Sequence, residues 1–457
     1  MDAHSEKTVI RLLCCALPFS VLNITMFNVA LPEIAGEFRV SPSAAAWVVT
    51  GFAPLYSVGS LLYGKLADIY PVRRLLMAAI AIFGCGSLLG LFAFNFPMLL
   101  AGRFVQTVGA SCFPAMAMQV PSRFVKEERR GQALGVVSAT LAVAGGFGPI
   151  LGGWIAEWFH WRSLFLISIG VVLTLPFIHR HFPRETGKNG GGIDLAGAGL
   201  FGLSAILFML SVTQADARLA AAGFALLAAF LFQQRKAAQP FVPPALFRNR
   251  RYSKGLIMGS LSSSTNISVT LLTPLALHHV YGFHSGLIGL IMFPGAMSAA
   301  LLGKFGGKLA DRKGSRFVMA LAAALTAAGL LALSASLGAW PWLLAACLIL
   351  ANCGSNFMQT ALAKRISVGL APEHVGIGMG VFGLTNFLTV GMFGTVVTKA
   401  AEWPAFAALN PIHPHGQLAV FGGIYLALCV LPLCTAGLIW GDRPAKKTLG
   451  NKEVMER

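Results

Sequence analysis

The sequence predicts an all-α integral membrane protein with fourteen transmembrane helices. Of its 457 residues, 56% are hydrophobic and only 11% are charged, whereas a soluble protein carries about 25% charged residues. Apolar runs of about 20 residues, the length that crosses a bilayer as a helix, recur along the chain. They are too long for barrel strands, and backbone in hydrocarbon must satisfy its own hydrogen bonds, so each run is predicted to be helical. The runs lie at 9–32, 46–65, 75–94, 98–122, 132–156, 163–179, 195–214, 217–233, 255–277, 286–306, 317–338, 340–362, 375–398 and 417–440.

The positive charges indicate how the chain is oriented. With the N-terminus in the cytoplasm, loops and helix rims on that side hold 30 of the 35 Lys and Arg residues. The outer loops hold Arg39, Arg162, Arg218 and Lys399, and Arg103 lies within a run. This asymmetry is what the positive-inside rule describes, so we expect both termini in the cytoplasm. The net charge of +18 then reflects topology, and we expect no nucleic-acid partner.

One motif occurs twice. Gly64-Lys-Leu-Ala-Asp68-Ile-Tyr-Pro71-Val-Arg73-Arg74 follows the second predicted helix, and Gly307-Lys-Leu-Ala-Asp311-Arg-Lys-Gly314-Ser-Arg316 follows the tenth. The copies occupy matching loops if a second six-helix group begins near residue 255. We therefore predict an N-terminal bundle at 1–181, a two-helix insertion with a basic linker at 182–254, a C-terminal bundle at 255–440 and a tail at 441–457.

The repeated loop is predicted to act as a conformational latch. Its acid can cap a helix start or pair with a nearby cation, and breaking that pair would favour another tilt of the two bundles. A simple charged turn would explain one copy, but two copies at matching positions favour the latch. The predicted latch residues are Gly64, Asp68, Arg73, Arg74, Gly307, Asp311 and Arg316.

The fifth predicted helix is rich in glycine around one proline. Gly148, Gly152 and Gly153 allow close helix approach, and Pro149 removes one backbone hydrogen bond and can bend the helix. A bent, closely packed helix between the bundles would restrict leakage and bias which side opens. Ordinary helix packing is the alternative explanation.

Polar residues within the apolar runs predict a cavity. Arg103 lies within a span, where a charge costs about 2.5–3.5 kcal/mol on insertion scales, so we expect it to face a cavity with a partner; snorkelling near the helix end is the alternative. Asn352, Asn356 and Gln359 share one helix face by their spacing. Each polar residue could instead bond a neighbouring helix. The predicted substrate or coupling cavity comprises Asn23, Thr25, Asn28, Arg103, Gln106, Asn266, Asn352, Asn356, Gln359 and Asn386.

These motifs together resemble the major facilitator superfamily. The repeated loop is similar to its family motif, Arg103-Phe-Val-Gln106 to its fourth-helix arginine motif, and Gly148-Pro149-Ile-Leu-Gly152-Gly153 to the fifth-helix motif of exporters. Leu22-Asn23-Ile-Thr25-Met-Phe-Asn28-Val-Ala-Leu-Pro32 resembles the first-helix motif of the fourteen-helix drug:proton antiporter branch. Within that branch the chain is most similar to the tetracycline efflux proteins of Gram-positive bacteria. The resemblance implies a bacterial plasma-membrane transporter.

The chain departs from that branch in its acidic residues. The branch motif has Asp where Asn23 stands, the tetracycline exporters have an acid where Ile24 stands, and they have another where Val390 aligns. None of the seventeen acids lies near the middle of a predicted span. A cationic drug or a metal-chelated tetracycline would need a buried carboxylate, so we expect a neutral amphipathic substrate such as a phenicol. Proton coupling would then use an acid at a helix end, a histidine such as His278 or His279, or the substrate itself.

The sequence therefore predicts a drug exporter that works by alternating access with proton antiport. A tetracycline/proton antiporter, an importer and an uncoupled facilitator are the alternatives within this class. No H-E-x-x-H motif, buried acid pair or phosphate-binding loop occurs, so we expect no enzyme activity, no metal and no cofactor. A receptor or scaffold would not need a polar interior face. We expect a monomer whose partners are a small-molecule drug, protons and the lipid bilayer.

Overall fold

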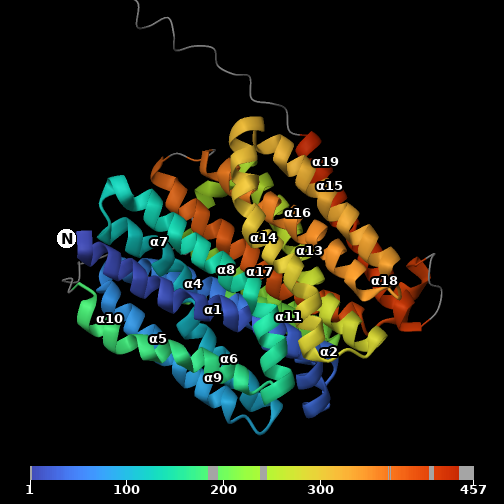
Figure 1. Cartoon of the computed structure of the whole chain (residues 1–457). Helices are drawn as coiled ribbons and strands as arrows, with labels where there is room; N and C mark the ends of the chain where they lie inside the picture. The colour runs from blue at the N-terminus through green and yellow to red at the C-terminus, as the bar shows by residue number, and fades with distance from the viewer. Residues whose placement is uncertain are drawn as a thin grey trace, which may run out of the picture.

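The computed structural model describes residues 3–183, 194–236, 244–368, 370, 372–410 and 416–441. All regular secondary structure in these ranges is helical. Helices from the first part of the chain gather on one side of a single bundle and those from the last part on the other (Figure 1). Long helices α8 and α14 run side by side where the two groups meet.

The N-terminal half is defined as α1 to α10. Short breaks at Gly51 and Ser111 divide otherwise continuous segments, and a 3-10 turn joins α9 to α10. The elements are α1 (Ala3–Phe38), α2 (Pro42–Ala45), α3 (Trp47–Thr50), α4 (Phe52–Ile69), α5 (Val72–Leu91), α6 (Phe96–Ala110), α7 (Cys112–Phe124), α8 (Glu127–Phe159), α9 (Ser163–Ile169), η1 (Gly170–Thr174) and α10 (Leu175–His181).

An inserted pair of helices precedes the C-terminal half, which is defined as α13 to α19. The inserted pair is α11 (Leu195–Gln214) and α12 (Ala217–Lys236), followed by η2 (Pro244–Arg248). The C-terminal elements are α13 (Arg250–Tyr281), α14 (Ser285–Lys313), α15 (Ser315–Ser336), α16 (Pro341–Val368), α17 (Pro372–Ala400), η3 (Pro404–Leu409), α18 (Gly416–Leu428) and α19 (Val430–Trp440).

The helices confirm an all-α membrane protein. Every predicted apolar run falls on helix, apart from a few turn or bend residues. Within the described residues, eleven helical segments are long and apolar enough to cross a membrane. The runs at 98–122, 255–277 and 286–306 are not among the eleven. For α13 the reason is visible in its sequence, because the polar stretch from Ser262 to Asn266 interrupts the apolar face. The count of fourteen spans stays a prediction.

The turns between helices alternate between two ends of the bundle. We call the end that holds the start of α1 and the end of α19 the termini end. The opposite end is called the far end, and it holds the turns at 39–41, 92–95, 160–162, 215–216, 282–284, 337–340 and 401–403. Local chemistry fixes several of these turns. Asn95 Oδ1 accepts from the Met98 N–H at 2.8 Å and begins α6. Gly282, at φ +68°, ends α13 in a left-handed conformation that glycine adopts without strain.

The two halves repeat the same contacts. Arg123 Nη1 donates to the Ala67 carbonyl at 2.6 Å, and Lys364 Nζ donates to the Ala310 carbonyl at 3.1 Å. Ala67 and Ala310 are equivalent residues of the repeated motif, 243 positions apart.

The tight helix crossings repeat as well. Gly109 packs against the backbone of residues 79 and 83, and Gly354 packs against the backbone of residues 322 and 326, which lie 243 positions further along the chain. The sequence repeat therefore corresponds to a structural repeat.

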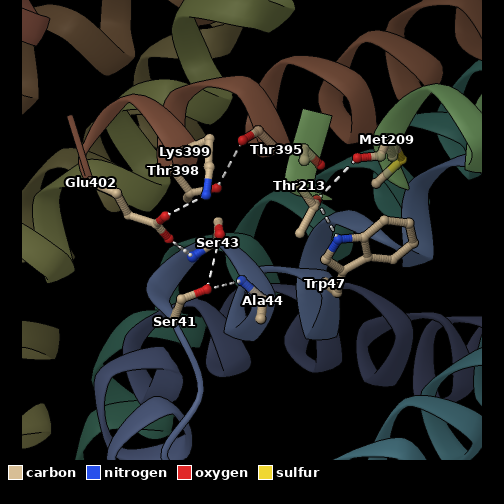
Figure 2. Close-up of polar contacts among 10 residues, drawn as sticks. All are labelled: Ser41, Ser43, Ala44, Trp47, Met209, Thr213, Thr395, Thr398, Lys399 and Glu402. Atoms are coloured by element: carbon tan, nitrogen blue, oxygen red, sulfur yellow. Dashed lines mark hydrogen bonds and ion pairs between the residues drawn. The ribbon is translucent and has the colours of Figure 1, made fainter. Parts of the chain in front are cut away.

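The inserted pair lies along the edge where the halves meet. Phe208 and Phe224 join α11 to α12, with ring centroids 4.8 Å apart. α11 contacts α4 of the N-terminal half and α17 of the C-terminal half. Trp47 Nε1 donates to Thr213 Oγ1 at 2.8 Å, which ties α11 to α3 (Figure 2). The pair thus touches both halves through α11, while Phe224 of α12 stays exposed.

Candidate functional site: a pocket between the two halves

A cavity of about 270 Å³ lies between the two halves. The N-terminal half contributes α1 and α8, and the C-terminal half contributes α13, α14 and α16. The lining residues are Thr25, Asn28, Gly145, Gly146, Pro149, Asn266, Val269, Thr270, Met292, Ala296, Leu348, Asn352 and Asn356. Of the predicted cavity residues, these include Thr25, Asn28, Asn266, Asn352 and Asn356.

The polar groups of this pocket are uncharged. Amides come from both halves, and the lining residues that the structure describes include no acidic or basic side chain. Asn352 Nδ2 donates to the Leu348 carbonyl at 2.9 Å within α16. By contrast, Asn28 Oδ1 and Asn356 Oδ1 find no hydrogen-bond partner in the described part of the chain. A buried amide oxygen without a partner costs free energy, and one such oxygen belongs to a lining residue of each half.

Two predicted cavity residues bond within the C-terminal half instead. Gln359 Nε2 donates to Ser263 Oγ at 2.9 Å, and Asn386 Nδ2 donates to Gln359 Oε1 at 3.2 Å. These bonds join α13, α16 and α17. Gln359 and Asn386 are not among the residues that line the pocket.

Arg103 lies inside the N-terminal half. Its side chain is 1% exposed, and neither Arg103 nor its partners Asn23 and Gln106 line the pocket. The guanidinium donates through Nε to the Val48 carbonyl at 2.8 Å and through Nη1 to Asn23 Oδ1 at 2.6 Å and Gln106 Oε1 at 2.7 Å. The ring of Phe27 lies 4.4 Å from the guanidinium carbon. Carbonyls, amides and an aromatic face thus hold this charge within the bundle, and a place for Arg103, Asn23 and Gln106 in a substrate or coupling cavity stays a prediction.

The glycines of the fifth predicted helix set how closely α8 packs. Gly148 and Gly152 pack against Thr25 and Met26 of α1, and Gly153 packs against the Ser285 carbonyl of α14, with no room for a Cβ at any of the three. Pro149 lies inside α8 and lines the pocket. The helix α8 is thus in close contact with both halves beside the cavity.

Carboxylates join the halves at the far end. Glu402, just after α17, accepts from the Ser43 N–H at 2.9 Å and from Lys399 Nζ at 2.8 Å, as Figure 2 shows. Thr395 Oγ1 lies 3.4 Å from Thr50 Oγ1 in the same region. On the other side of the interface, Ser285 Oγ of α14 donates to Glu33 of α1. The sequence did not single out Glu33 or Glu402, since a carboxylate at a helix rim normally faces water.

The predicted latch lies at the termini end. Gln119 Nε2 donates to the Gly64 carbonyl at 2.8 Å, Gly307 lies near Thr360, and Arg316 Nη2 reaches the Trp440 carbonyl at 3.4 Å. Arg73 is half-buried and Arg74 is exposed. The side chains of Asp68 and Asp311 lie outside the described residues.

A polar pocket between two repeated helical bundles is the architecture of a membrane transporter. Residues 13–395 match the model of the Major Facilitator Superfamily, and the chain belongs to this superfamily. Its fold and family are those of transporters.

Three curated relatives cover most of the chain. The riboflavin transporter RibZ of Clostridioides difficile is 26% identical over 81% of this chain and 82% of its own. The cephamycin export protein CmcT of Amycolatopsis lactamdurans is 28% identical over 86% of each chain. The methyl viologen resistance protein SmvA of Salmonella typhimurium is 28% identical over 82% of this chain and 81% of its own. The superfamily is thus shown, whereas the fourteen-helix branch and the similarity to tetracycline exporters stay predictions.

Solved structures share the fold. A bacterial homologue of the human lysosomal transporter Spinster, in an inward-facing and unoccupied conformation, aligns with a TM-score of 0.65 at 15% identity, over 96% of this chain and 97% of that chain. A peptide transporter POT mutant in complex with alafosfalin aligns with a TM-score of 0.68 at 12% identity, over 94% and 93% of the two chains.

Proposed function

We propose that this transporter exports uncharged, amphipathic drug-like molecules by alternating access through the pocket between its halves. The observation that carries the proposal is the chemistry of the lining. Amides of Asn28, Asn266, Asn352 and Asn356 stand among apolar side chains, and no charged group lines the pocket within the described part of the chain. A neutral molecule with hydrogen-bonding groups would lose the least hydration and gain the most contacts in such a site.

Charged cargoes fit this lining less well. A dication such as methyl viologen, or tetracycline chelated to a metal ion, would lose hydration without gaining a carboxylate partner. Phenicols are neutral and carry hydroxyl and amide groups, which suit a lining of uncharged amides. A tetracycline/proton antiporter is therefore the less favoured alternative.

Riboflavin is a second candidate cargo. The relative RibZ is a riboflavin transporter, and riboflavin is an uncharged ring system with amide-like groups and hydroxyls. The same amide lining supports this cargo as it supports a phenicol.

The proposed location is a bacterial plasma membrane, with both termini in the cytoplasm. The predicted cytoplasmic loops and helix rims hold 30 of the 35 Lys and Arg residues, and this distribution supports the orientation. Proton antiport is the proposed energy source, and an uncoupled facilitator is its alternative. Uptake into inverted vesicles with and without a pH gradient separates the two.

Drug susceptibility of an expressing strain tests the choice of cargo. We expect increased resistance to phenicols and none to quaternary cations. Asn356→Asp places a carboxylate in the pocket, so it should lower phenicol resistance about tenfold, which corresponds to about 1.4 kcal/mol of binding, and should create resistance to lipophilic cations.

Asn95→Asp is the control, because it adds the same charge at the start of α6, away from the pocket lining. This control should leave the order of drug preference unchanged. Wild-type protein that protects against quaternary cations and not against phenicols or flavin analogues would contradict the proposal.

A further inference from the structure

The contacts that close the far end depend on ionised carboxylates. We propose that Glu402 and Glu33 form a pH-sensitive seal, and that protons arriving from the far side release it and allow the pocket to open there. This inference concerns the regulation of the transport pocket and rests on the proposed alternating access. It gives a role to acids at helix ends in a chain whose pocket has no acid among its described lining residues.

Glu402 provides one side of the seal. Its carboxylate belongs to the C-terminal half, and it accepts the backbone N–H of Ser43, which belongs to the N-terminal half, at 2.9 Å. Lys399 Nζ holds the second oxygen at 2.8 Å. The side chain is 19% exposed, so solvent can deliver a proton. Figure 2 shows the carboxylate between Lys399 and the start of α2.

The surroundings of Glu402 favour its ionised form. Burial alone would raise the pKa of the carboxyl, but hydrogen bonds from Lys399 and Ser43 and the charge of Lys399 together lower it below its ordinary value. Lys399 is the charged group that faces it. The described side chains beside it at the start of α2 are uncharged, namely Ser41 and Ser43.

Glu33 provides the other side of the seal. It belongs to α1 and accepts from Ser285 Oγ, in the first turn of α14. Two other titratable residues stand at this helix start. A carboxylate oxygen of Glu157 occupies the space that a Cβ at Gly286 would take, and His284 immediately precedes Ser285.

Protonation of Glu402 weakens its contacts. The neutral carboxyl loses its attraction to Lys399, and it is a poorer acceptor for the Ser43 N–H. Because the pKa of Glu402 is lowered in the sealed state, the seal is fully present above the ordinary carboxyl range. It is lost as the pH falls through the lowered value.

Glu37 offers a matched control on the same helix. Its carboxylate lies four residues beyond Glu33, but it accepts from Trp161 Nε1 and Arg162 Nη1 and lies 3.1 Å from His160 Nε2. All these partners belong to the N-terminal half. Removing the charge of Glu37 therefore changes a far-end carboxylate without touching a contact between the halves.

Labelling of the pocket from outside intact cells tests the seal. Thr270→Cys places a thiol in the pocket lining, and a membrane-impermeant maleimide reports opening of the far end. The parent chain gives the background from its eight native cysteines. Maleimide reactivity itself changes with pH, so each rate is divided by that of an exposed far-end cysteine, Ala217→Cys.

We expect the corrected rate to stay constant as external pH is lowered from about 7.5 to about 5, and to rise as the pH falls further, below the ordinary glutamate pKa of about 4.3. Glu402→Gln combined with Glu33→Gln should label about tenfold faster at neutral pH and lose the pH dependence. Ser285→Ala should shift the pH dependence of the labelling rate part of the way toward that of the double variant. Glu37→Gln should keep the wild-type pH dependence. A double variant with the wild-type pH profile, or an equal shift in Glu37→Gln, would overturn the inference.

Two readouts separate this inference from the proposed function. If cells gain no drug resistance but show the expected labelling, the inference of a seal stands and the proposed cargo is excluded. Cells that gain phenicol resistance but label independently of pH would retain the cargo and exclude the seal. Labelling of each variant in inverted vesicles, where the reagent enters from the termini end, checks that it is folded.

Discussion

A single buried charge shows how this protein stabilises an ion in hydrocarbon without a counter-ion. Arg103 is held by a backbone carbonyl and two side-chain amides, between aromatic rings. Ser168 Oγ and Ser87 Oγ in turn accept from Asn23 Nδ2 and Gln106 Nε2. Each neutral acceptor offers a partial charge, and the shell fixes the guanidinium within the N-terminal half.

Substitution of Asn23 by Asp tests this account. The new carboxylate would lie where Asn23 Oδ1 now accepts from Arg103 at 2.6 Å, and Ser168 Oγ could turn to donate to it. Hydrogen bonds between ionised groups are roughly twice as strong as neutral ones, so we expect the free energy of unfolding to rise by about 1–2 kcal/mol. Thermal unfolding in detergent measures this change.

Asn23→Ala is the control, and it should lower the unfolding temperature. Since Asn23 does not line the pocket, the order of drug preference should stay the same in both variants. An Asp variant less stable than the Ala variant would show that the Arg103 charge is already fully compensated.

At the scale of elements, the contact between α8 and α14 depends on glycines of both helices, which leave no room for a larger side chain. Gly153 packs against the Ser285 carbonyl, and Gly289 packs against the Pro149 carbonyl. Both close contacts occur beside the pocket, where a separation of the helices would open a path along the interface. The spacing of glycines predicted close packing, but it could not predict which neighbour each glycine meets.

Gly153→Ala should therefore make the transporter leaky. The added methyl has no room against the Ser285 carbonyl, and relief of such overpacking costs about 1–3 kcal/mol. We expect a several-fold faster collapse of an imposed pH gradient in proteoliposomes. Gly135→Ala, on the same helix with nothing within 4 Å of the added atom, should leave the gradient unchanged. Equal leakage in both variants would mean that α8 and α14 do not form the barrier.

At the scale of the whole molecule, the sequence predicted where the helices lie better than it predicted which side of each helix faces the pocket. Apolar runs gave helix positions because length and hydropathy are local properties. The spacing of Asn352, Asn356 and Gln359 placed all three on one face, yet the first two line the pocket and Gln359 bonds Ser263. A buried helix can turn the same polar side chains toward another helix or toward a cavity. Which of the two occurs depends on how segments distant in the sequence pack around it. The same limit concealed Glu33 and Glu402, whose partners lie 252 and 359 residues away.

The orientation of the whole chain leads to the last prediction, which also tests whether the inserted pair crosses the membrane. Ala217 is exposed at the far-end turn between α11 and α12, and Arg250 is exposed at the termini end where α13 begins. If the basic residues set the topology, Ala217→Cys should react with an impermeant maleimide in intact cells, and Arg250→Cys should react only in inverted vesicles. Both side chains are exposed, so a difference in labelling reports the side of the membrane and not burial. Labelling of both cysteines from one side would show that the inserted pair does not span the bilayer, and the reverse pattern would place the termini outside and contradict the proposed direction of export.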